Sequence, residues 1–155
     1  MTGPAVDRVA ITPEAAVVIR RLRGTHGPLM FHQSGGCCDG SAPMCYPRGD
    51  FIVGDEDVLL GLLDDTSPGT PAPALTPGQP VPDELSPVWI SGPQFLLWQH
   101  TQLLLDVVPG RGAGFSLEAP EGVRFLTRSR VFDADEQAWL DACPAPRGRD
   151  LQAPG

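Results

Sequence analysis

The chain has 155 residues, a length at which a single domain can bury a hydrophobic core of its own. Its 11 basic and 19 acidic residues give a formal net charge of -8 at pH 7. This surplus of negative charge repels nucleic-acid phosphates and anionic lipid headgroups, so we expect neither nucleic acid nor a membrane as partner. No apolar stretch approaches the ~20 residues of a membrane span, and the opening residues contain no signal-peptide core. We therefore expect a cytoplasmic protein with reduced thiols.

Residues 12–24 form the clearest predicted helix. Thr12 can cap its N-terminus, Pro13 suits the first helical position, and Gly24 provides a stop. The apolar face of this helix consists of Ala15, Val18, Ile19 and Leu22. Its last turns carry Arg20, Arg21 and Arg23. Cations are favoured at the negative end of the helix dipole, and we expect these three to form a solvated face.

Beyond this helix the hydrophobic period changes to two. Leu29, Phe31 and Gln33 alternate with Met30 and His32, as expected of a strand, so His32 points away from Phe31. Short apolar runs bounded by Gly, Pro or Asp follow at residues 51–53, 58–63, 88–90, 103–108, 114–117 and 123–126. Residues 94–100 are compatible with a helical turn or a strand. The pattern predicts an α+β, β-rich fold in which the N-terminal helix packs on a small β core.

The composition shifts to Pro, Gly, Thr, Ser and Ala over residues 66–87, which predicts a disordered, exposed insertion. A capping-box pattern at Asp133 and Glu136 predicts a last short helix over residues 133–143. This helix should carry Trp139 and Leu140 inward. Residues 144–155 are expected to fray. Residues 8–132 thus form the body of a single domain.

A cysteine-rich loop is the strongest candidate for chemistry. Cys37, Cys38 and Cys45 lie within nine residues, among glycines that let the backbone bend. Thiolates are the soft ligands that zinc, copper(I) and iron–sulfur clusters select. With His32 and Asp39 nearby there are enough ligands for a tetrahedral metal site, although the spacing is not that of a zinc finger. Further ligands would have to come from the fold or from a second subunit in a homodimer.

The same residues support two other interpretations. In the first, a Cys37 or Cys38 thiolate attacks an aldehyde or thioester, with His32 as base and Arg111 holding an anion. His100 is the other plausible imidazole. In the second, the protein is an interaction module and the cysteines only pack as small buried hydrophobes.

The glycine-rich segment 110–114 lacks the pattern of a phosphate-binding loop and is expected to form a turn between two strands. Arg111 and Glu118 lie beside these flexible glycines and could line a small anion or carboxylate site. Cys143 follows the body of the domain, and we treat it as incidental.

The opening of the chain resembles that of the A-type iron–sulfur carriers, which have the HesB-like fold. The resemblance lies in Thr12-Pro13-Glu14-Ala15-Ala16, the helix and strand that follow, and Ser34-Gly35-Gly36-Cys37-Cys38-Asp39-Gly40. Two longer blocks, residues 30–47 and 110–118, resemble an uncharacterised bacterial family, number seven hundred and seventy-nine of the domain-of-unknown-function series. The match covers about residues 8–132 apart from the proline-rich insertion.

This resemblance implies a HesB-like β core and, because genes of the family often stand beside aldehyde dehydrogenase genes, an aldehyde dehydrogenase as partner. The carriers hold their cluster with one cysteine after the glycine pair and two in a later cys-gly-cys. This chain has residues 114–118 in the place of the later pair, so only Cys37 or Cys38 matches a carrier ligand. The leading hypothesis is a non-enzymatic accessory protein with a metal or thiol site that assists the dehydrogenase.

Overall fold

The computed structural model describes residues 7–33, 43–49, 53–66, 81–110, 116–143 and 145–148. In chain order the elements are β1 (Val9–Ile11), α1 (Pro13–His26), β2 (Leu29–Gln33), β3 (Met44–Pro47), β4 (Val58–Asp64), β5 (Leu85–Ile90), α2 (Gly92–Trp98), β6 (Thr101–Pro109), the 3-10 helix η1 (Ala119–Glu121), β7 (Val123–Val131) and α3 (Ala134–Ala142). This strand-rich α+β arrangement confirms the predicted fold class. None of the described helices is long and apolar enough to cross a membrane.

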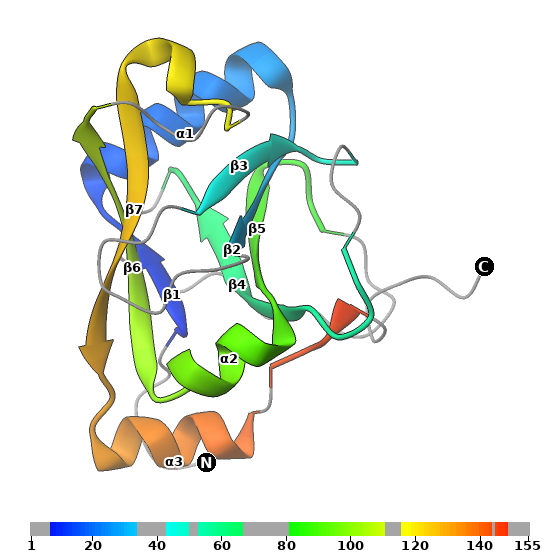
Figure 1. Cartoon of the computed structure of the whole chain (residues 1–155), viewed down its shortest axis with the longest axis vertical. Helices are drawn as coiled ribbons and strands as arrows, with labels where there is room; N and C mark the ends of the chain where they lie inside the picture. Colours follow the sequence, from blue (N-terminus) through cyan, green and yellow to red (C-terminus); the bar gives the residue numbers. More distant parts are fainter. Residues whose placement is uncertain are drawn as a thin grey trace.

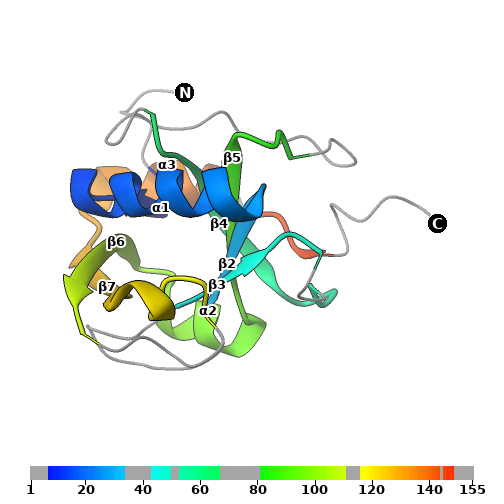
Figure 2. The ribbon, with the colours of Figure 1, turned by 90° about the horizontal axis from the view of Figure 1, so that it is seen from above.

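The strands form two mixed sheets (Figure 1). One has the strand order β1-β6-β7 and the other the order β3-β2-β5-β4. Pairing is parallel between β1 and β6 and between β2 and β5, and antiparallel elsewhere. The view in Figure 2, from the end at which α1 lies, shows the sheet of β6 and β7 beside the sheet of β2, β4 and β5. Helices α2 and α3 lie at the opposite end of the molecule (Figure 1).

The main core lies where the two sheets and α1 meet. Helix α1 contacts β6 of one sheet and β2 of the other. Phe31 of β2 and Phe125 of β7 are both fully buried, and their rings meet edge to face with centroids 5.2 Å apart. An aromatic pair in this geometry contributes about 0.5–1.5 kcal/mol beyond the burial of its surface. The pair therefore joins the two sheets through their largest core side chains.

Helix α1 begins as the sequence predicts. The Thr12 hydroxyl oxygen accepts a hydrogen bond from the Ala15 amide at 3.1 Å. The four apolar residues of the predicted face, Ala15, Val18, Ile19 and Leu22, are all buried. The helix nevertheless continues past Gly24 and ends at Gly27, whose φ of 81° lies in the left-handed region that favours glycine.

The side chains of Arg20 and Arg21 are 56% and 53% exposed, as expected of a solvated face, but all three arginines of α1 also have partners in the fold. Arg23 binds Asp65 through two hydrogen bonds of 2.8 and 3.0 Å, and the Asp65 side chain is fully buried. These bonds raise the pKa of Arg23. Arg20 donates to the Asp65 carbonyl oxygen at 2.7 Å, and Arg21 binds the Glu121 carboxylate at 2.7 Å. The basic side of α1 thereby fixes the end of β4 and the turn before β7.

The end of the proline-rich segment belongs to a sheet. Strand β5 begins at Leu85, and Pro87 lies opposite Leu62 of β4. Proline is tolerated there because the pairing of β5 with β2 begins only at Val88, so no ladder bond from the Pro87 nitrogen is needed. Arg48 donates hydrogen bonds to the carbonyl oxygens of Val81, Pro82 and Leu85 and holds the chain that enters β5. Residues 67–80 lie outside the described residues.

The remaining elements differ from the prediction in detail. Strands β1 and β3 were not expected, and the ambiguous residues 94–100 turn out to be helical up to Trp98. Residues 116–118 form a bend and turn, and residues 51–52 and 114–115 lie outside the described part of the chain. The capping box of Asp133 and Glu136 is present, and Leu140 is buried while Trp139 is only partly buried.

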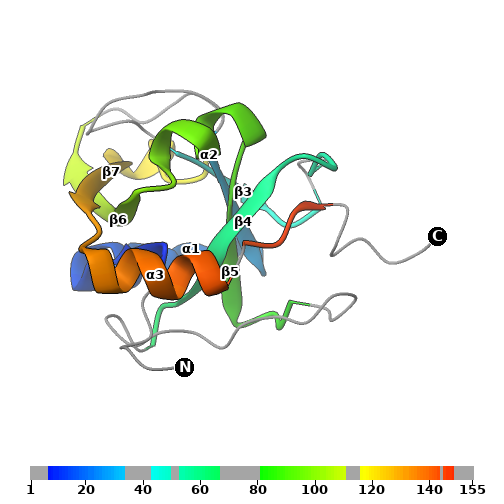
Figure 3. The same ribbon diagram turned by 90° about the horizontal axis from the view of Figure 1, so that it is seen from below.

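Residues 145–148, expected from the sequence to fray, are bonded to β4 instead. The Leu59 amide donates to the Pro146 carbonyl oxygen at 2.8 Å, and Arg147 forms a β-bridge with Val58. Figure 3 shows the chain leaving α3 and running toward β4. Arg8 fixes the end of α3 by donating to the carbonyl oxygens of Leu140 and Cys143. This segment is thus ordered by backbone pairing with β4 together with the packing of Ala145 against the main core.

A substitution of Ile19 by Asp tests the packing of α1. Ile19 is 0% exposed, so the Ile19→Asp variant places a carboxylate in the main core and should lose more than about 4 kcal/mol of unfolding free energy. Val17 on the same helix is 53% exposed, and Val17→Asp should change stability by less than about 1 kcal/mol. Urea unfolding of both variants measures this. Equal stabilities would contradict the assigned buried face.

Two deletions test the limits of the proline-rich segment. Replacing residues 67–80 by a short Gly-Ser linker should leave the melting temperature nearly unchanged, because that composition buries little surface. Replacing residues 66–87 removes the buried Leu85 and Ser86 from β5 and should prevent folding. Thermal melts followed by circular dichroism compare the two. A collapse of the shorter deletion would make the insertion structural.

Candidate functional site

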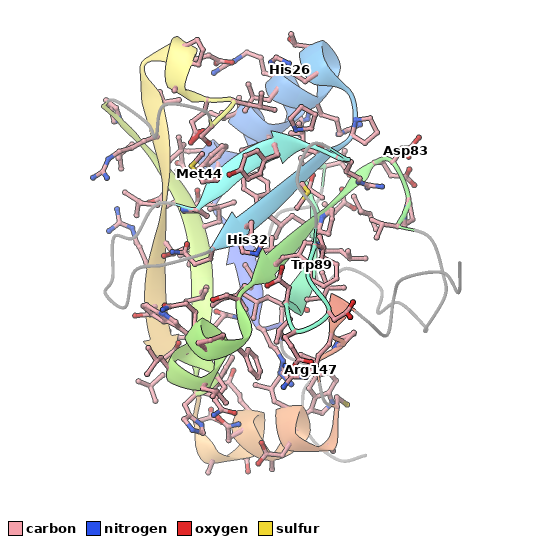
Figure 4. The ribbon with its side chains drawn as sticks, turned by 45° about the vertical axis from the view of Figure 1, so that its right-hand side comes forward. His26, His32, Met44, Asp83, Trp89 and Arg147 are labelled. Carbon is pink, nitrogen blue, oxygen red and sulfur yellow. The ribbon has the colours of Figure 1, made fainter. Side chains whose placement is uncertain are left out.

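Two of the predicted site residues, Cys45 and His32, lie on opposite faces of the sheet β3-β2-β5-β4. Cys45 pairs with Phe31, and residues directly opposite one another project from the same face. His32 is the next residue along β2 and therefore projects from the other face. There it stands in a row with Met44 of β3 and Trp89 of β5, its partners on the neighbouring strands (Figure 4). The structure does not bring Cys45 and His32 together.

Cys45 is a core residue. Its side chain is 0% exposed and packs in the main core with Phe31. Its amide donates to the Ser116 hydroxyl oxygen at 2.8 Å, and its carbonyl oxygen accepts from the Leu117 amide at 3.1 Å. Burial, followed by the nearby Glu118 carboxylate, raises the pKa of the Cys45 thiol far above its ordinary value. A thiol in these surroundings stays protonated and chemically inert.

Glu118 lies in the interior as well and does not line a surface site. Its side chain is 1% exposed, and its Oε2 atom accepts a hydrogen bond from the Phe125 amide at 3.2 Å. This bond ties the turn before η1 to β7. Arg111, the other member of the anion site considered from the sequence, lies outside the described residues. A carboxylate this deeply buried does not present itself to a ligand arriving from solvent.

His32 has a carboxylate partner that the sequence analysis missed. The ring is 4% exposed, and its Nε2 atom lies 3.1 Å from Oδ2 of Asp57. Because a carboxylate is the acceptor, Nε2 carries the proton in this hydrogen bond. Asp57 is two residues before Leu59, which pairs with Trp89 on this same face. Residues two apart on a strand project from the same face. The strand predicted for residues 58–63 could therefore have pointed to Asp57, which precedes Leu59 by two residues.

Three of the predicted site residues, Cys37, Cys38 and Asp39, lie outside the described residues. They belong to the segment that joins β2 to β3, and the ends of that segment are adjacent because His32 pairs with Met44. Within the part of the chain that the structure describes, no group of three or more His, Cys, Asp or Glu side chains could hold a metal ion. On the face of the sheet where this segment begins, His32 and Asp57 form a hydrogen-bonded polar pair.

The other reactive side chains are elsewhere. His100 lies in the turn before β6, and its Nδ1 atom is 3.3 Å from Oε1 of Gln137 on α3. Cys143 follows α3 and is a partly exposed free thiol. Its carbonyl oxygen accepts from Arg8. Neither residue lies on the same element as His32. Of the two histidines considered as site residues, His32 is the one that lies near the cysteine-rich loop in the sequence.

The ligand set of the iron–sulfur carriers does not fit the described residues. The resemblance noted from the sequence puts residues 114–118 where the carriers have their later cysteine pair. Of these, Ser116 and Glu118 accept hydrogen bonds from the Cys45 and Phe125 amides. Neither supplies a thiolate.

Thiol alkylation tests these assignments. At pH 8 the native protein should leave Cys45 unmodified by iodoacetamide, because its raised pKa removes the thiolate and its burial blocks access. Cys143, which is partly exposed, should react. Peptide mass spectrometry after a timed reaction reports both. Rapid labelling of Cys45 in the folded protein would contradict its place in the core, and labelling of all four cysteines after unfolding in urea is the control.

Comparison with known proteins places the chain in a family without an assigned activity. No significant match was found among curated proteins or among solved structures. The family model described as Domain of unknown function (DUF779) matches residues 18–131. The match covers β2 and β3, the cysteine-rich loop between them, Asp57 and both sheets apart from β1. The chain therefore belongs to the DUF779 family.

Proposed function

We propose that this protein is a non-enzymatic accessory protein with a metal or thiol site centred on His32. The observation that carries the proposal is the partly buried hydrogen bond between His32 and Asp57. It lies on the strand that leads directly into the segment containing Cys37, Cys38 and Asp39. In this proposal Cys45 is structural, which reduces the ligand set considered from the sequence to His32, Cys37, Cys38 and Asp39.

The chemistry of these side chains supports a metal with a preference for nitrogen and sulfur. Imidazole and thiolate together suit zinc, copper and iron, whereas magnesium and calcium prefer oxygen ligands. Asp57 would fix the orientation of His32 and make its ring a stronger donor, as outer carboxylates do in metal sites. The bound metal would supply Lewis-acid or redox chemistry, while the protein residues would bind and orient it.

The proposed partner is an aldehyde dehydrogenase. This partner is the one that the resemblance to the family implies. An acidic accessory protein with a net charge of -8 would deliver or protect a metal or thiol through contacts with a complementary basic surface. Co-purification of the two proteins at low and at high salt tests this association.

One observation favours a second candidate function, a thiol-dependent enzyme. A carboxylate that orients a histidine is also the arrangement that activates a nucleophile, with Asp57 and His32 in the roles of orienting group and base. Cys37 or Cys38 would then attack the carbonyl carbon of an aldehyde or thioester. The thiol proton would pass to His32. With an aldehyde, His32 would return the proton to the carbonyl oxygen and give a thiohemiacetal; with a thioester, the C–S bond of the substrate would break, His32 would protonate the departing thiolate, and an acyl-enzyme would remain.

Elemental analysis distinguishes these possibilities. Protein purified anaerobically and without an affinity tag should contain about one zinc, copper or iron ion per chain. The ion should be lost in His32→Ala and in the Cys37→Ser, Cys38→Ser double variant. It should be retained in Cys45→Ala, the matched control, because that side chain faces the opposite side of the sheet.

Other outcomes would contradict the proposal. A metal-free protein whose Cys37 or Cys38 forms an adduct with an aldehyde or thioester would favour the enzyme. A metal-free protein that forms no adduct would favour the interaction module. Loss of the metal in Cys45→Ala, with folding intact, would return Cys45 to the ligand set and contradict the assignment of the site to the His32 face.

A further inference from the structure

We propose that residues 145–148 are a latch that positions Asp57 against His32, so that the C-terminal segment controls the geometry of the site. The functional part of this inference rests on the proposed function, because it concerns the same histidine. The positional part stands on contacts between described residues. It assigns a positioning role to Asp57 and a controlling role to a segment that is far from His32 in the sequence.

The first step is the turn that carries Asp57. Its amide donates to the Gly54 carbonyl oxygen at 3.1 Å, and its Oδ2 atom accepts from the Gly54 amide at 2.9 Å. The same Oδ2 atom accepts from Nε2 of His32. The carboxylate is therefore shared between its own turn and the histidine, and its position depends on how the turn is held.

The second step is the contact of this turn with the C-terminal segment. The Gly148 amide donates to the Asp57 carbonyl oxygen at 2.7 Å. Arg147 forms the bridge with Val58 and lies 3.5 Å from the Glu56 carboxylate. Together with the bond from Leu59 to Pro146, these contacts continue the sheet by a short fifth segment beside β4. Figure 4 shows Arg147 below the face on which His32 and Trp89 lie.

The third step is the closeness of the backbones. A Cβ atom added at Gly148 would overlap the Gly54 carbonyl oxygen and would lie 3.2 Å from the Val53 side chain. A Cβ atom at Gly92 would lie 3.0 Å from the Glu56 carbonyl oxygen and 3.8 Å from the Arg147 guanidinium, so this part of the turn is also closely packed. Only a residue without a side chain allows the latch to reach the carbonyl oxygen of Asp57.

The consequence concerns the tautomer of His32. The hydrogen bond to the Asp57 carboxylate favours the Nε2–H tautomer of His32. If residues 145–148 are released, the Asp57 carbonyl oxygen and the Leu59 amide lose their hydrogen bonds to Gly148 and Pro146, and the carboxylate is no longer fixed against Nε2. The share of the Nε2–H tautomer of His32 would then fall.

Nuclear magnetic resonance of the histidine nitrogens tests the latch. The full chain contains 3 histidines, so the ring nitrogens of His32 can be assigned in a ¹⁵N-labelled sample, with His26 and His100 as internal references. In metal-free native protein His32 should be the Nε2–H tautomer. In Gly148→Ala its nitrogen shifts should move toward a mixture of tautomers, and amide exchange of Leu59 should accelerate about tenfold. Asp57→Asn should change the His32 nitrogens in the same way.

Gly24→Ala is the matched control, because a Cβ atom at Gly24 meets nothing within 4 Å. It should leave all three histidines unchanged. If Gly148→Ala fails to fold, a chain ending at Cys143 provides the same test, because it lacks both backbone hydrogen bonds of the latch. Unchanged His32 nitrogens in the folded latch variants would overturn the proposal. Because these spectra use metal-free protein, a failure of the metal proposal would leave the result on the latch intact.

Discussion

Strand β2 is paired on both sides, with β3 antiparallel and with β5 parallel, and the alternation of its side chains decides which surroundings each of them meets. Phe31 enters the core between the two sheets and contacts Phe125 of the other sheet. His32, one residue later, faces Met44 and Trp89 instead. A slip of one residue in this pairing would exchange the two environments, so the register of β2 determines both the core and the candidate site.

Polar side chains have different surroundings on the two faces of the sheet β3-β2-β5-β4. On the core face, Cys45 and Glu118 are both almost without exposure. The Cys45 thiol keeps its proton, and Oε2 of Glu118 accepts from the Phe125 amide, while Oε1 of Glu118 has no hydrogen-bond partner among the described residues. Such groups connect elements and have little access to ligands. On the other face, the polar pair of His32 and Asp57 is also shielded, yet the chain beyond His32 continues into the cysteine-rich loop. The polar side chains on the two faces therefore differ in the segments that lie beside them more than in how deeply they are buried.

The sequence was sufficient for features that depend on neighbours in the chain. The cap at Thr12, the apolar face of α1 and the direction of His32 relative to Phe31 follow from local periods, and the structure confirms them. It was insufficient where pairing partners are distant. Strand β3 is four residues long and becomes a strand by pairing with β2, and Pro146 is ordered by the Leu59 amide. The contact between Asp57 and His32 depends on the alignment of β4, β5 and β2, which local patterns in the sequence do not give.

The arrangement around Asp57 is more elaborate than packing alone requires. A buried ion pair or charged hydrogen bond is often no more stabilising than an apolar pair of similar volume, because both groups lose their water. Trp89 and Leu59 lie on the same face and would accept an apolar neighbour in place of His32. The chain instead places a carboxylate there, and its turn meets the backbone at Gly148 so closely that a side chain at that position would overlap the Gly54 carbonyl oxygen. A polar pair kept in position by such a close backbone contact is the arrangement that the proposed role of His32 requires.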